Sequence, residues 1–201
     1  MKKQLLTIAA LGISSMASAQ ILDIDGMPPY KLGVMAGVNF PTFSGSEYSF
    51  TIGTQGGIDL MVDASEIIDD TYFRGQLKYS MKGATLEGVF DEYFTTHYIE
   101  IPIHYGYSYS LDSDWSILAD TGPYLAVGLA GTHRIQDTSI SDTFFHHYHA
   151  SRIDYGWGFQ LGLLFDQQFL LNLSCDFGFK NMNTVFLQNN CLSVGLTYFI
   201  E

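Results

Sequence analysis

Four histidines cluster in the second half of the chain, at spacings that suit a transition-metal site. They are His133, His146, His147 and His149. Imidazole nitrogens bind Zn²⁺ and similar ions, and short histidine-rich tracts are one source of such sites. No cysteine accompanies these histidines, and their segment has the composition of a loop, which fixes no coordination geometry. We therefore expect no metal and no other cofactor here, and interpret the stretch as a polar, aromatic loop.

The same stretch ends in His149-Ala-Ser151, which combines a base with a nucleophile. Residues two apart share one face of a strand, so the imidazole and the hydroxyl would meet. Such a pair also needs a carboxylate that orients the histidine. The nearby Asp154 has the opposite parity and would point to the other face of the strand. We therefore expect no catalytic residues and predict that the protein is not an enzyme.

The elements around these residues are predicted to be strands, because apolar and polar residues alternate with a period of two along most of the chain. No comparably persuasive helical period appears. The alternating segments are residues 31–40, 57–62, 73–82, 99–108, 115–131, 154–163, 169–180 and 192–200. Eight segments of about ten residues match the strands of a small transmembrane barrel.

The connections between these segments alternate in length. Three are short, at residues 63–70, 111–114 and 166–168. The others are mostly longer, at residues 41–52, 83–95, 132–151 and 181–189. Short periplasmic turns and longer external loops are typical of outer-membrane barrels. The fold class predicted from this pattern is all-β, an eight-stranded antiparallel up-and-down transmembrane β-barrel.

Alternation alone does not decide which face of each strand points inward. A soluble lipocalin-like barrel or sandwich also alternates, with its apolar face inside. Here the polar face is rich in Gly, Ser, Thr, Asn and Gln, and only 15% of all residues are charged. A water-exposed surface usually carries about 25–35% charged residues. Small polar residues suit a narrow lumen, and aromatic residues such as Tyr107, Trp115 and Phe177 lie near strand ends. We therefore expect the apolar faces to contact lipid.

Charged residues on the polar face would lie in the lumen, where an unpaired charge is costly. Assumed hairpin registers place three acid–base pairs opposite one another. These pairs are Asp59 with Arg74, Lys78 with Glu100, and Asp154 with Lys180. We interpret them as groups that plug and stabilise the lumen. Polar side chains meeting across eight strands would leave no open pore.

The first nineteen residues are typical of a secretory signal peptide. Two lysines precede a short apolar core at residues 5–13, and an Ala-Ser-Ala cleavage signal ends at Ala19. The apolar core is shorter than the roughly 20 residues of a membrane-spanning helix. We expect residues 1–19 to be removed and residues 20–201 to form one barrel domain.

Charge and cysteine content narrow the set of partners. The formal net charge of −12 repels phosphate backbones, so nucleic-acid binding is not expected. Cys175 falls on the apolar parity and Cys191 on the polar parity. Side chains on opposite faces cannot form a disulfide without a bulge, so we expect free thiols even in an oxidising compartment.

Several segments together resemble the PorT family of outer-membrane β-barrels. They are Lys31-Leu-Gly-Val-Met-Ala-Gly-Val-Asn39, Phe73-Arg-Gly-Gln-Leu-Lys-Tyr-Ser-Met-Lys-Gly-Ala84, Tyr98-Ile-Glu-Ile-Pro-Ile103, Thr121-Gly-Pro-Tyr124 and Leu192-Ser-Val-Gly-Leu-Thr-Tyr-Phe199. The order of Tyr-x-Glu-Ile-Pro followed by Gly-Pro-Tyr is the most specific part. The resemblance implies an eight-stranded barrel like OmpX and the OmpA membrane domain, and it carries no activity with it.

The function expected from the sequence is that of a non-enzymatic, monomeric outer-membrane barrel of a Gram-negative cell. Its external loops would make adhesive, stabilising or secretion-accessory contacts, with membrane lipid and a protein as partners. One alternative is a lipid-modifying enzyme, because outer-membrane lipid A deacylases use a similar His-x-Ser on a strand, here His149 and Ser151. Another is a secreted soluble barrel that binds a small apolar ligand.

Overall fold

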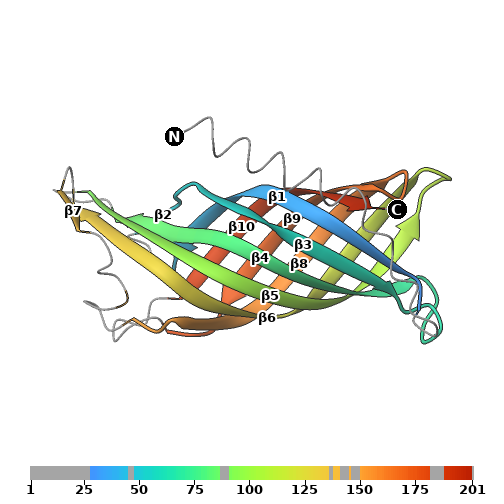
Figure 1. The fold of residues 1–201 in the computed structure, drawn as a ribbon, viewed down its shortest axis with the longest axis horizontal. Coiled ribbons are helices and arrows are strands. Elements are labelled where there is room, and N and C mark those ends of the chain that lie inside the picture. The colour runs from blue at the N-terminus through green and yellow to red at the C-terminus, as the bar shows by residue number, and fades with distance from the viewer. Residues whose placement is uncertain are drawn as a thin grey trace.

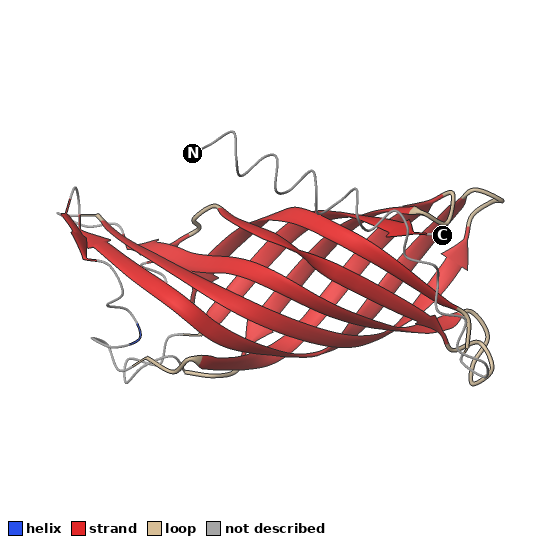
Figure 2. Cartoon of the chain, in the orientation of Figure 1, coloured by secondary structure: helices blue, strands red, loops and turns tan. Residues whose placement is uncertain are grey.

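A computed structural model describes residues 28–44, 48–86, 91–135, 138–140, 145, 150–181 and 188–200. In this part of the chain, ten β-strands form one antiparallel sheet (Figures 1 and 2). The strands are β1 (Tyr30–Phe43), β2 (Tyr48–Ser49), β3 (Gly53–Asp63), β4 (Thr71–Leu86), β5 (Glu92–Ser110), β6 (Trp115–Ile135), β7 (Thr138–Ile140), β8 (Ile153–Phe165), β9 (Phe169–Gly178) and β10 (Asn189–Ile200). Eight long strands pair in the order β1-β3-β4-β5-β6-β8-β9-β10, and β10 pairs back with β1. The sheet is therefore a closed eight-stranded barrel, as predicted.

The closed sheet is built from strands with unlike faces. Along β10, Leu192, Val194 and Leu196 point outward, and Leu196 is 53% exposed. Ser193 and Thr197 alternate with them, point inward and are almost fully buried. The same alternation holds on the other long strands, so the large apolar side chains cover the outside and polar side chains fill the inside. This arrangement is the reverse of a soluble barrel, which buries its apolar face.

Three short turns join neighbouring strands at one end of the barrel, called here the turn end. They connect β3 to β4, β5 to β6 and β8 to β9, close to the predicted positions. In the last of them, Asp166 and Gln167 have φ angles of 50° and 55°, the left-handed region that tight hairpin turns favour. The longer connections lie at the opposite end, called the loop end, near β2 and β7 in Figure 1.

Several strands extend further toward the loop end than the periodicity predicts. The expected connections at 83–95 and 132–151 contain the ends of β4, β5 and β6 and the whole of β7. Backbone pairing continues there because β4, β5 and β6 hydrogen-bond one another up to Leu86, Glu92 and Ile135. The alternation fades in this region, since polar residues such as Thr95 and Thr96 occupy both faces. Strand ends that pair without having one apolar and one polar face cannot be recognised from alternation in the sequence.

Among the described residues, no helix has the length and apolar character needed to cross a membrane.

Candidate functional site

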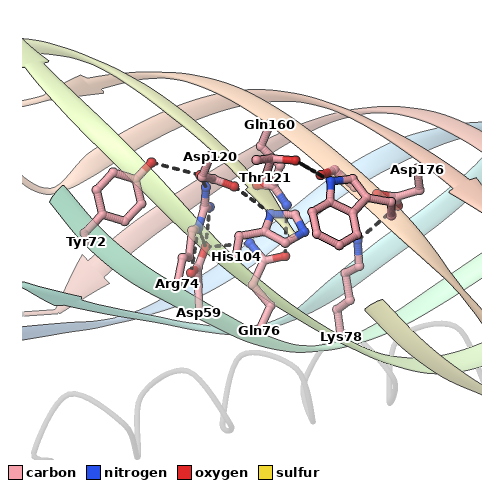
Figure 3. A network of polar contacts seen from close by, with 12 residues as sticks. Asp59, Tyr72, Arg74, Gln76, Lys78, His104, Asp120, Thr121, Gln160 and Asp176 are labelled. Carbon is pink, nitrogen blue, oxygen red and sulfur yellow. Dashed lines mark hydrogen bonds and ion pairs between the residues drawn. The ribbon is translucent and has the colours of Figure 1, made fainter. Parts of the chain in front are cut away.

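The middle of the barrel holds a first cluster of ionised side chains around Arg74 of β4 (Figure 3). Its guanidinium contacts Asp59 of β3 at 2.5 Å through Nη2 and at 3.0 Å through Nε. Nη1 reaches Asp120 of β6 at 3.3 Å. All three side chains are 5% exposed or less. Two carboxylates thus contact one guanidinium away from water, where a buried charge is costly without partners.

Neutral donors complete the hydrogen bonding of the two carboxylates. The Tyr72 hydroxyl donates to Asp120 Oδ2 at 2.9 Å, and the Gln76 amide donates to Asp59 Oδ2 at 3.0 Å. Thr197 of β10, the strand that closes the ring by pairing with β1, donates to the same Asp59 oxygen at 3.2 Å. His104 Nδ1 lies 2.7 Å from Asp120 Oδ1. Buried charges persist only when their remaining lone pairs are satisfied in this way, so the cluster ties five strands together.

A second cluster lies nearer the loop end and centres on Glu100 of β5. Its two carboxylate oxygens contact Lys78 at 2.8 Å and Lys82 at 2.6 Å. Lys78 also lies 3.7 Å from Asp176 of β9, across the lumen. The Lys82 ammonium sits 4.7 Å from the ring centroid of Tyr124, within cation–π distance. Every one of these groups points inward and is buried, so the lumen carries charge of both signs.

The structure brings together two of the three predicted acid–base pairs. Lys78 lies directly opposite Glu100. Asp59 contacts Arg74, but the register between β3 and β4 differs from the expected one by two residues, and Asp59 lies opposite Gln76. The contact survives because the long Arg74 side chain spans the diagonal between cross-strand neighbours.

The third predicted pair is not formed. The β8–β9 register has the expected offset, yet its last pair is Gly156 with Gly178, and the ladder ends before Lys180. Asp154 accepts a hydrogen bond from the Asn189 amide at 2.9 Å instead. Among the ion pairs of the described residues, none joins Asp154 to Lys180. The periodic pattern was extended two residues past the true end of β9.

Sequence reasoning did not pair Lys82, His104, Asp120 and Asp176, which all belong to the two clusters. Lys82, His104 and Asp176 have the inward parity of their strands. Parity would therefore have placed them in the lumen, while their partners lie on strands that are distant along the chain. Asp120 precedes Gly122-Pro123, where the alternation is blurred, and no simple pattern marks it.

Apolar side chains close the barrel on both sides of the charges. At the turn end, buried apolar side chains come from six strands. They are Met61, Tyr72, Leu118, Leu164, Leu170 and Phe199. A half-open cavity of about 300 Å³ lies at this end, and Met61 and Tyr72 form part of its wall. A second apolar cluster, with Phe43, Phe94, Tyr98 and Tyr124 among its members, fills the loop end. Buried apolar side chains thus lie at both ends of the lumen, on either side of the ion clusters.

The histidine-rich stretch is described only in part. His133 stacks on Phe94 with ring centroids 4.6 Å apart, and its Nε2 lies 2.8 Å from a Glu92 carboxylate oxygen. His146, His147 and His149 lie outside the described residues. Within the part that is described, no group of three or more His, Cys, Asp or Glu side chains is placed to hold a metal ion.

Ser151, the nucleophile of the considered His-x-Ser pair, makes local hydrogen bonds. Its hydroxyl donates to the Ile153 carbonyl at 2.9 Å and accepts from the Ile153 amide at 3.2 Å. Its partner His149 is not among the described residues. Cys175 and Cys191 are free, and they lie on opposite faces of the barrel wall as predicted.

Comparison with solved structures finds several outer-membrane proteins at low sequence identity, and the first named here reaches a TM-score that indicates the same fold. Neisserial surface protein A has a TM-score of 0.50 and 14% identity, with 84% of this chain and 97% of that chain covered. The attachment invasion locus protein Ail of Yersinia pestis has a TM-score of 0.47 and 12% identity, with 87% and 100% covered. The outer membrane enzyme PagL has a TM-score of 0.42 and 12% identity, with 86% and 100% covered.

At the level of sequence, no curated protein matches the chain. The family of the outer membrane protein beta-barrel domain matches residues 28–183, which is most of the chain. Together with the apolar outside and polar inside of the closed sheet, this match rejects the soluble ligand-binding barrel. The chain belongs to the outer membrane protein beta-barrel domain family, and its place is the outer membrane.

Proposed function

We propose that this protein is a non-enzymatic, monomeric barrel that anchors in outer-membrane lipid and presents its loop end to protein partners outside the cell. The observation that carries the proposal is the filled lumen. Two ion clusters lie between two apolar clusters, and this filling supports a barrel without an open path for a polar solute. In a barrel that conducts no solute, the exposed surfaces are left to carry the function, by contact with other molecules.

The shape of the loop end supports a role in contact. Strands β5 and β6 have 19 and 21 residues, about twice the roughly ten needed to cross a bilayer. On their outer faces the apolar side chains stop near His97, whose Nδ1 lies 2.6 Å from the Tyr79 hydroxyl. Beyond this point the outward residues are polar or aromatic, including Tyr93 and Arg134. The sheet thus continues beyond its apolar part, toward β7 in Figure 1, and this extension supports a contact surface outside the lipid.

The test of the closed lumen is conductance across a planar bilayer. The purified, folded barrel is expected to give no ion current, while a general porin in the same membrane gives stepwise openings. Steady channels from the barrel at neutral pH would overturn the proposal, because the ion clusters would then line a pore rather than fill it.

We also propose the finer grouping with the PorT family and a secretion-accessory form of the contact role. The segments that carry the resemblance supply lumen residues, including Lys78, Lys82, Glu100 and Tyr124. This supports a shared barrel interior. The test compares proteins secreted by a deletion strain and by the same strain complemented with this chain. Loss and recovery of secreted proteins would support the role, and an unchanged pattern would leave adhesion or membrane stabilisation as the form of contact.

The absence of catalysis has its own test. Ser151→Ala removes the hydroxyl of the His-x-Ser pair. Structurally, it removes the local hydrogen bonds to Ile153. The lipid A of cells expressing either chain is expected to show the same acylation by mass spectrometry. A difference that depends on Ser151 would establish a lipid-modifying enzyme.

A further inference from the structure

Two side chains in the apolar cluster of the loop end, those of Phe145 and Ala150, do not come from a strand of the barrel wall. Phe145 lies in the third external loop, between β7 and β8, and is only 7% exposed. Its ring packs edge-on against Tyr98, with centroids 6.1 Å apart and the planes at 86°. A loop residue has therefore turned into the mouth of the barrel and is buried there.

The barrel wall leaves room for this ring. The inward-facing residues of β6 become smaller toward the loop end, from Tyr124 through Ala126 to Gly128. A methyl group added at Gly128 would lie 2.4 Å from Phe145 Cζ, and the next nearest ring atom would be 2.9 Å away. Contacts below 3.0 Å force something to move. Any side chain larger than hydrogen at this position therefore competes with the ring.

Arg152 also contacts the Phe145 ring. Its guanidinium carbon lies 4.8 Å from the Phe145 ring centroid, within cation–π distance. Its Nη1 donates to the carbonyls of Gly128 at 3.1 Å and Leu129 at 2.9 Å, just beyond the last β6–β8 pair. The Gly128 amide donates back to the Arg152 carbonyl at 2.6 Å. The ring is thus enclosed by a strand, an aromatic wall and a fixed cation.

We infer that Phe145, Gly128 and Arg152 form a latch that docks the third external loop inside the mouth of the barrel. The socket accepts one aromatic ring, and this chain supplies it. Phe145 is consequently held at the mouth of the barrel, and withdrawal of its ring releases the chain at this point. This inference concerns the docking of the loop and holds whether or not the loop end binds a partner.

The experiment measures proteinase K cleavage between residues 136 and 150 in outer-membrane vesicles, mapped by mass spectrometry. Phe145→Ala removes the ring, and Gly128→Ala adds the methyl that displaces it. Each is expected to speed cleavage of this segment about tenfold or more, since cleavage follows the open fraction and losing a buried phenyl ring raises that fraction. Heat-modifiability on a gel confirms for each variant that the barrel is folded.

The double variant distinguishes a latch from general weakening. When Phe145→Ala has emptied the socket, the methyl of Gly128→Ala meets no ring, and the double variant is expected to be cleaved no faster than Phe145→Ala alone. Effects that multiply in the double variant would overturn the latch, because each substitution would then act on something else. A folded single variant that is cleaved at the rate of the original protein would overturn it as well.

Discussion

Glu100 shows at the scale of single residues why the lumen charges are arranged as clusters. It is fully buried and faces two ammonium groups, with Lys78 and Lys82 each within 3 Å of one of its oxygens. Removing one partner of a buried ion pair is costly because it leaves the other charge without compensation. Here a single carboxylate contacts two cations, so its loss leaves two buried ammonium groups without this partner.

Replacing Glu100 with Gln is therefore expected to destabilise the barrel strongly. The loss is about 3–5 kcal/mol in the free energy of unfolding, the usual cost of breaking a buried ion pair. It is measured by denaturant unfolding in lipid vesicles, followed by tryptophan fluorescence. Glu66→Gln, at an exposed position in the turn between β3 and β4, is the matched control and should change little. Equal midpoints for the two variants would contradict the role assigned to Glu100.

A second prediction at this scale concerns a polar contact on the outside of the barrel. The Trp157 indole N–H donates to Thr121 Oγ1 at 2.7 Å, and Thr121 donates to the Gly158 carbonyl at 2.8 Å. Lipid offers no replacement acceptor for the indole. Thr121→Val should therefore cost about 1–3 kcal/mol in the same unfolding measurement. Thr121→Ser, which keeps the hydroxyl, should recover most of the loss, and failure to do so would reject the hydrogen bond as the cause.

How far the charged residues could be predicted depends on what fixes a register. Lys78 and Glu100 face each other at the expected place. The β3–β4 register is shifted by two, because the conformation of the turn at 64–70 sets it and periodicity cannot show that conformation. Long-range partners such as Asp176 of β9 were beyond reach for another reason. The parity of a residue shows whether its side chain points into the lumen. Which inward side chains contact each other across the lumen depends on how the barrel closes.

At the scale of elements, the strands divide into a lipid-facing part and a part beyond the lipid. The eight-strand count and the turn end followed from alternation, because lipid outside and a polar lumen inside impose opposite demands on successive residues. Beyond His97 that demand ends, and the outer ends of β5 and β6 were mistaken for loops. The apolar outer face of β5, with Ile101 and Ile103 each more than 40% exposed, marks the part that alternation could find.

This division predicts where water reaches the outer face of β5. In a chain with both native cysteines replaced by alanine, Thr95→Cys and Tyr93→Cys are expected to react with a membrane-impermeant maleimide on intact cells. Ile101→Cys and Ile103→Cys, on the same face, should stay unlabelled. Labelling of all four positions alike would place the membrane boundary elsewhere.

At the scale of the whole molecule, ring closure removes the free sheet edge. Each long strand has hydrogen-bonded neighbours on both sides, and β1 meets β10 from Leu32 to Phe43. An edgeless sheet with all its backbone groups paired unfolds as one unit in detergent. The barrel is therefore expected to migrate at different positions on a gel before and after boiling. A single position under both conditions would contradict a closed barrel in the membrane fraction.

The ion clusters also constrain how the protein is made. Strand β4 carries Arg74, Lys78 and Lys82, while their counter-charges come from β3, β5, β6 and β9. A half-assembled sheet lying open in the bilayer would turn these three cations toward acyl chains with part of their partners missing, at a high energetic cost. Biogenesis by stepwise insertion of single hairpins is therefore disfavoured. The cost is avoided when the sheet closes away from the acyl chains, so that the three cations of β4 have met their carboxylate partners before they enter the membrane.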